Sequence, residues 1–160
     1  MSATPRIGQM LKGRLGSYTV TSKLYESVWK GRYGRVTHHE GLLGCADYSN
    51  SDTQGSNVVV KSVNHWRLRS ERDVLLRYQS RTPYIRPLLD EVDPDTPSHA
   101  LILRWLDTDL LDATDDKGLE SSDVKLVAKG VLEALQVLHA DGLIYTGKQK
   151  FSKWHERQRS

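Results

Sequence analysis

A long helical stripe near the carboxyl end is the sequence feature that most constrains the fold. Over residues 122–140 the apolar side chains recur at intervals of three and four, as on one face of an α-helix. These side chains are Val124, Val127, Ala128, Val131, Leu135 and Leu138. The polar run 121–123 predicts an N-cap, and Gly142 predicts the end of the helix. An apolar face of this length favours association if nothing covers it.

Short β-type segments precede this helix. Residues 18–24 alternate between two faces and residues 27–31 form a second short run, so the two predict a hairpin. Residues 58–61, Val-Val-Val-Lys, and residues 100–105 predict two further buried strands. Residues 67–79, which lie between those strands, follow helical spacing. The order of strands, helix, strands and helix predicts one domain of the α+β class.

Glycine and charge mark the segments outside these elements. Residues 1–17 are expected to be a flexible lead-in, and residues 33–57 a long surface insertion. Residues 147–160 carry five cations and one anion, whereas the remainder of the chain carries 18 cations and 19 anions. The net charge of +3 therefore comes from this basic tail. The charge of the domain itself gives no reason to expect nucleic-acid binding.

Cysteine count and hydropathy exclude several classes of protein. Cys45 is the only cysteine, so no disulfide can form within the chain, which is typical of a reducing compartment. No apolar run approaches the roughly 20 residues that span a bilayer, and residues 1–12 lack the apolar core of a secretion signal. We expect an intracellular protein, cytoplasmic or nuclear, without membrane contact. His38, His39 and Cys45 are too few for a typical zinc site, so we expect no bound metal there.

Several segments, taken in order, resemble a protein kinase domain. Residues 58–61 resemble the Val-Ala-Ile-Lys strand of that family, and residues 70–75 resemble its αC helix. Residues 101–106 resemble its fifth strand and hinge. Residues 135–144, Leu-Gln-Val-Leu-His-Ala-Asp-Gly-Leu-Ile, are similar to the end of its αE helix. The matches extend over residues 18–146 and are most similar to divergent kinase-like domains of fungal type.

The resemblance implies a nucleotide site between the small lobe and the first part of the large lobe. Lys61 would bind the α- and β-phosphates of ATP, and Glu71 would hold Lys61 through an ion pair. Two unrelated, solvated charges are the alternative interpretation of this pair. The family uses ATP and Mg²⁺ to phosphorylate protein Ser and Thr hydroxyls, so these are the cofactors that the resemblance implies.

The resemblance also implies which residues would contact the adenine. They are Leu24, Val28, Leu103, Arg104 and Leu106. Leu24 and Val28 would form an apolar roof over the base, and Leu103 would be the gatekeeper. Arg104 and Leu106, in a hinge at 104–107, would offer backbone groups to the adenine edge.

Two departures from the family pattern predict an inactive chain. Residues 23–28, at the turn of the hairpin, contain none of the glycines that let backbone N–H groups approach phosphates, and Glu26 adds negative charge there. Tyr145, Thr146 and Gly147 occupy the positions of the family's His, Arg and catalytic Asp. Without that base we expect very slow phosphoryl transfer and, at best, weak binding of ATP.

Other functions stay open beside this remnant kinase. A non-catalytic, pseudokinase-like module would dock a protein partner on the exposed face of helix 122–140. A nucleic-acid binder would use the cations and the aromatic residues Phe151 and Trp154 of the tail 147–160, although an unstructured tail is the better explanation. A translated intron is a further hypothesis for the tail, because Gly147 and Lys148 can be encoded as GGT-AAG, which contains the GTAAG of a common intron start.

Overall fold

A six-stranded antiparallel sheet forms the body of the molecule, with the strand order β1-β2-β3-β4-β6-β5. The computed structural model describes residues 4–34, 55–63, 66–92, 99–115 and 118–144. The strands are β1 (Met10–Lys12), β2 (Ser17–Tyr25), β3 (Val28–Gly34), β4 (Asn57–Lys61), β5 (Leu88–Glu91) and β6 (Leu101–Arg104). The helices are α1 (Trp66–Tyr78), α2 (Leu110–Asp115) and α3 (Ser121–Ala140). The predicted α+β class is confirmed.

Strand β4 runs through the centre of the core, which explains its continuous apolar sequence. Val58 and Val60 pack in one buried cluster with Trp29 and Ile102. Val59 points to the other face and packs in a second cluster, which includes Leu68 of α1 together with Leu88, Leu101 and Leu103. A strand that is covered on both faces has no polar alternation to show in its sequence.

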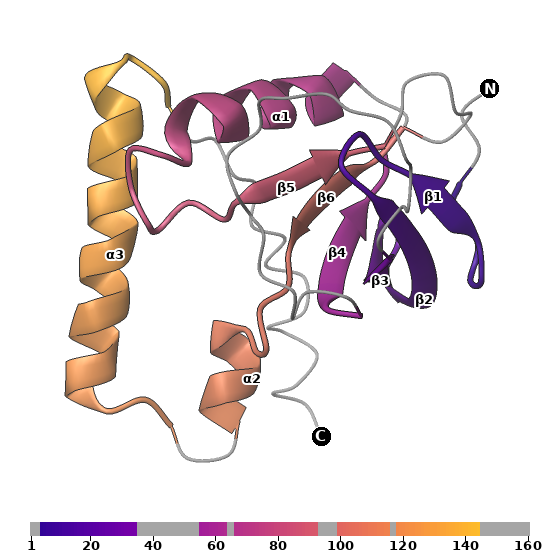
Figure 1. The fold of residues 1–160 in the computed structure, drawn as a ribbon. Helices are drawn as coiled ribbons and strands as arrows, with labels where there is room; N and C mark the ends of the chain where they lie inside the picture. Colours follow the sequence, from indigo (N-terminus) through magenta and orange to yellow (C-terminus); the bar gives the residue numbers. More distant parts are fainter. Residues whose placement is uncertain (1–3, 35–54, 64–65, 93–98, 116–117, 145–160) are drawn as a thin grey trace.

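Helix α1 covers the face of the sheet to which Val59 points, and Figure 1 shows it above β5 and β6. Leu68 is buried in the second cluster, and Leu75 packs against that cluster two turns later. Glu71 lies three residues after Leu68, so it shares the face of α1 that is directed at the sheet. The packing of α1 therefore decides where the Glu71 carboxylate lies.

Helix α3 stands beside the sheet, near the carboxyl end of α1 and the loop before β5 (Figure 1). It ends in a Schellman motif, in which the N–H of Leu143 donates to the carbonyl of Leu138 and the N–H of Gly142 to that of His139. Gly142 has a φ of +75°, as the predicted helix end requires. The predicted N-cap is not formed, because Glu120 holds that position without a side-chain hydrogen bond.

The structure differs from the predicted elements and boundaries in five places. The lead-in 1–17 contains β1, a three-residue strand that pairs with β2 and buries Leu11. At the two ends of the insertion predicted at 33–57, β3 extends to Gly34 and β4 begins at Asn57, and residues 35–54 lie outside the described residues. The hinge 104–107 begins inside β6, whose last residue is Arg104. The short helix α2 was not predicted, and the long helix begins at residue 121 rather than 122.

Candidate functional site

An ion pair between the last residue of β4 and the second turn of α1 defines the candidate site. The Nζ atom of Lys61 lies 2.8 Å from Oε1 of Glu71 and 2.7 Å from Oε2. The two side chains are 31% and 33% exposed, respectively. A pair this accessible to water adds little to stability, about 1 kcal/mol at most. Its importance is positional, because it holds one amine at a fixed place beneath the sheet.

Apolar side chains surround the pair on the same face of the sheet. Lys61 pairs with Val28 on β3 and with Leu101 on β6, and Val59, two residues before it, pairs with Leu103. Leu103 is 5% exposed, and Val28 packs against the same cluster. The structure thus brings the expected gatekeeper and one of the two expected roof residues to the face that carries Lys61. Leu24, the other roof residue, is more than one-third exposed and lies outside this cluster.

At the start of the expected hinge, the backbone N–H and carbonyl of Arg104 already have hydrogen-bond partners. The N–H of Arg104 donates to the carbonyl of Pro87 at 3.1 Å. The carbonyl of Arg104 accepts a 2.7 Å hydrogen bond from Nε of Arg86, whose pKa is lowered by burial. A carbonyl oxygen has two lone pairs, so it can still accept a second donor. Any adenine contact at this carbonyl would therefore share the acceptor with Arg86.

Two aromatic and apolar side chains follow Arg104. Trp105 is half-buried against the second cluster, and the ammonium of Lys30 lies 4.7 Å from the centroid of its ring. This distance is typical of a cation–π contact. Leu106 is largely exposed. Of the three consecutive residues, Trp105 is the one that packs against the sheet.

The turn between β2 and β3 contains no glycine, and the strand pairing beside it is irregular. Lys23 pairs with Trp29 and Tyr25 pairs with Val28, with a register shift between the two pairs. Glu26 is exposed at the turn. Side chains occupy the tip of the hairpin, where the family pattern would have glycines. The carboxylate of Glu26 repels an anion that approaches this edge.

Several expected residues lie outside the described part of the chain. These are His38, His39, Cys45, the family-loop positions Tyr145, Thr146 and Gly147, and the tail to residue 160. Within the described ranges, no group of three or more His, Cys, Asp or Glu side chains is placed to hold a metal ion. The same ranges contain no helix with the length and hydropathy that crossing a membrane requires.

Two carboxylates that sequence reasoning missed organise the described structure. Asp90 is 5% exposed and accepts hydrogen bonds from the backbone of Arg14 and Leu15 and from the hydroxyl of Tyr18. Asp141 accepts hydrogen bonds from groups near the end of α1. An acid inside the apolar run Leu-Leu-Asp-Glu-Val is a signal that could have identified Asp90, because a buried charge needs partners.

Comparison with known proteins supports the fold. No protein-family model matches the sequence, and no curated protein matches it. A solved structure described as "Structure of vaccinia related kinase 3" is similar, with a TM-score of 0.55 and 18% sequence identity. The match covers 88% of this chain and 43% of that chain, so the chain spans less than half the length of that kinase chain. The curled antiparallel sheet and its helices thus have the fold of part of a protein kinase.

Proposed function

We propose that this chain is part of a protein-kinase-like domain that retains a remnant nucleotide site and lacks phosphotransfer activity. The ion pair between Lys61 and Glu71 supports the proposal, because it presents one amine beside an apolar surface that includes Val28 and Leu103. An ammonium next to apolar walls suits a ligand with anionic phosphates and a flat base. The activity of the complete domain would be ATP-dependent phosphorylation of protein Ser and Thr hydroxyls.

The described residues fit part of ATP. Lys61 would neutralise charge on the α- and β-phosphates, with Glu71 fixing its position, and Val28 and Leu103 would contact the base. The hairpin tip fits poorly, since it carries Glu26 in place of a glycine-rich phosphate loop. The carboxylate beside Lys61 belongs to Glu71, which is already paired, so it is a poor ligand for Mg²⁺. We therefore propose nucleotide binding by this chain and no transfer step.

Thermal unfolding with and without ATP tests the proposal. A ligand at ten times its Kd adds about 1.4 kcal/mol to the free energy of unfolding, which raises the Tm by several degrees. We expect such a rise at millimolar ATP, and we expect Lys61→Ala to abolish it. Lys129→Ala is the matched control, because Lys129 is an exposed residue of α3 that forms an ion pair with Glu133 on the surface of the same helix. An unchanged Tm at saturating ATP, or an equal rise in Lys61→Ala, would contradict the proposal.

A second candidate function has its own observation, the apolar surface of α3. Leu126 and Leu132 are largely exposed, and Val124 and Val131 are about half exposed. A non-catalytic module would use these exposed apolar side chains of α3 to dock a protein partner. If this is the function, Leu126→Glu will reduce self-association or partner capture without changing the response to ATP. Sedimentation velocity of the two proteins distinguishes this outcome from the loss of the nucleotide site.

A further inference from the structure

A cavity of about 540 Å³ lies beside the first two turns of α1, between that helix and the ends of β5 and β6. Its apolar lining includes Leu68, Val92 and Leu101, all of which are buried. Trp66 also lines the cavity and is 66% exposed. A volume of this size falls within the range of roughly 300–1,000 Å³ that is typical of small-molecule sites. Neither Lys61 nor Glu71 lines it, so the cavity is separate from the candidate nucleotide site.

Three guanidinium groups from two distant segments lie around this cavity. Arg14 follows β1, and Arg69 and Arg72 lie on neighbouring turns of α1. Glu91 is the one carboxylate among the described lining residues. The described lining therefore has an excess of positive charge above an apolar floor.

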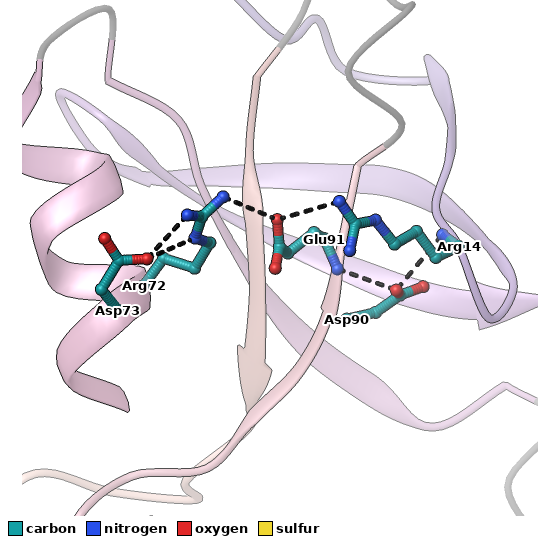
Figure 2. A network of polar contacts seen from close by, with 5 residues as sticks. All are labelled: Arg14, Arg72, Asp73, Asp90 and Glu91. Carbon is teal, nitrogen blue, oxygen red and sulfur yellow. Dashed lines mark hydrogen bonds and ion pairs between the residues drawn. The ribbon is translucent and has the colours of Figure 1, made fainter. Parts of the chain in front are cut away.

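Glu91 lies between Arg72 and Arg14, and it forms a close hydrogen bond with neither of them (Figure 2). Its Oε2 atom is 3.6 Å from Nη1 of Arg72 and 3.8 Å from Nη2 of Arg14, and both distances exceed those of a normal hydrogen bond. Arg72 is also held by Asp73, through Nε at 2.9 Å and Nη2 at 2.6 Å. Within the described residues, Arg69 has no hydrogen-bond or ion-pair partner. Arg69 and Arg14 therefore retain donors for a further anion.

We propose that this cavity binds an organic anion, namely a phosphate ester or carboxylate attached to an aromatic or branched aliphatic body. The guanidinium fork matches the oxygens of such a group and can bind them in pairs. The buried floor and the exposed indole of Trp66 would contact the apolar body. A free metabolite and a modified side chain of a peptide both offer this chemistry.

Titration of the full chain with phenyl phosphate, observed by ¹H–¹⁵N NMR, tests the proposal. The Trp66 indole signal, assigned with Trp66→Phe, is expected to shift. Phenol lacks the anion and inorganic phosphate lacks the body, so both are expected to bind at least about tenfold more weakly. Arg69→Gln and Arg14→Gln are each expected to weaken the binding of phenyl phosphate about tenfold. Arg32 is exposed and lies outside the cavity, so Arg32→Gln is expected to leave this affinity unchanged.

Three results would overturn the site: no shift at Trp66, equal affinity for phenol, or unchanged affinity in both Arg69→Gln and Arg14→Gln. Lys61→Ala is expected to bind phenyl phosphate normally, so failure of the nucleotide proposal and failure of this one are distinguishable. A short phosphotyrosine peptide identifies the source of the anion. Tighter binding than phenyl phosphate supports a peptide ligand, and equal or weaker binding supports a free small anion.

Discussion

The carboxylate of Asp141, directly after α3, accepts a 2.9 Å hydrogen bond from the hydroxyl of Tyr78, the last residue of α1. Arg81 and Arg77 add ion pairs to the same carboxylate at 2.7 and 3.1 Å. Asp141 and Tyr78 are 63 residues apart in the chain, so this cluster fastens the end of α3 to the end of α1. Because α1 also carries Glu71, the cluster links the long helix to the element that positions the Lys61 pair.

Asp141→Asn is expected to destabilise the protein at neutral pH and to lose this effect in acid. Hydrogen bonds from Arg81 and then Tyr78 hold the pKa of the Asp141 carboxyl below its usual value. A carboxyl whose pKa is lower in the folded state stabilises the protein above its unfolded pKa of about 3.9, and this stability disappears as the pH falls through the folded value. The difference in Tm between the wild type and Asp141→Asn should therefore shrink below about pH 4.

Calorimetry of both proteins between neutral and acidic pH measures this difference. Asp107→Asn is the matched control, since Asp107 is exposed and has no hydrogen-bond or ion-pair partner among the described residues. Its Tm is expected to follow that of the wild type at every pH. If the difference in Tm between the wild type and Asp141→Asn stayed constant down to strong acid, the charge of Asp141 would contribute nothing to stability.

Gly13→Ala is expected to lower the free energy of unfolding by about 1–3 kcal/mol, the usual cost of an overpacked core. A Cβ atom at this position would lie 2.2 Å from Oδ2 of Asp90 and 2.7 Å from Cε2 of Tyr18. Asp90 cannot move away easily, because its carboxylate also accepts hydrogen bonds from the backbone of Arg14 and Leu15. Urea unfolding of Gly13→Ala measures the loss.

The matched comparison for this variant is Gly55→Ala. Gly55 has a φ of +89°, and no atom lies within 4 Å of the position that a Cβ would take. The loss in free energy of unfolding caused by Gly55→Ala is therefore expected to come from backbone strain. If Gly13→Ala costs no more than an exposed substitution such as Lys12→Ala, the contact with Asp90 does not restrict this turn.

The sequence predicted the elements that carry their own pattern. The structure confirms the hairpin of β2 and β3, the buried strand β4, and helices α1 and α3. Most of their boundaries lie within one or two residues of the predicted ones. Strand β1 was missed because three residues are too few to show alternation, and Asp90, which lies more than 70 positions later, holds the turn that follows it. Such a contact belongs to the tertiary structure and leaves no local signal.

The candidate site was predictable only in part, for a related reason. The resemblance proposed Lys61 and Glu71 as a pair, but their contact depends on how Leu68 and Leu75 pack α1 against the sheet. The hydrogen bond from Arg86 to the carbonyl of Arg104 depends on two adjacent strands and could not be read from spacing. Helix α2 did have a local signal, because the Asp109 side chain accepts the N–H of Asp112 at 2.9 Å, as an N-cap does.

Arg86→Ala is expected to strengthen ATP binding by about two- to tenfold, which is the value of one net hydrogen bond. The substitution frees the carbonyl of Arg104 from its 2.7 Å donor, so the adenine edge no longer shares that acceptor. Isothermal titration with ATP measures the change. Arg104→Ala is the control, because it removes the side chain and keeps the carbonyl. Unchanged affinity in Arg86→Ala would mean that the Arg104 carbonyl is not the adenine acceptor.

The contact between Gly130 of α3 and Tyr84 of the loop before β5 yields the last prediction. A Cβ atom at residue 130 would lie 2.8 Å from Cδ1 of Tyr84 and 3.0 Å from Cε1, too close for normal packing. In an exposed helix, Gly→Ala gains about 1 kcal/mol from helix propensity. We expect the clash to outweigh this gain, so that Gly130→Ala lowers the Tm.

A double-mutant cycle separates the two effects. Tyr84→Ala removes the ring, and in that background Gly130→Ala should become stabilising by up to about 1 kcal/mol. The change of sign is the diagnostic result, and chemical denaturation of the four proteins measures it. If Gly130→Ala has the same effect in both backgrounds, the ring of Tyr84 does not restrict the packing of α3 at residue 130.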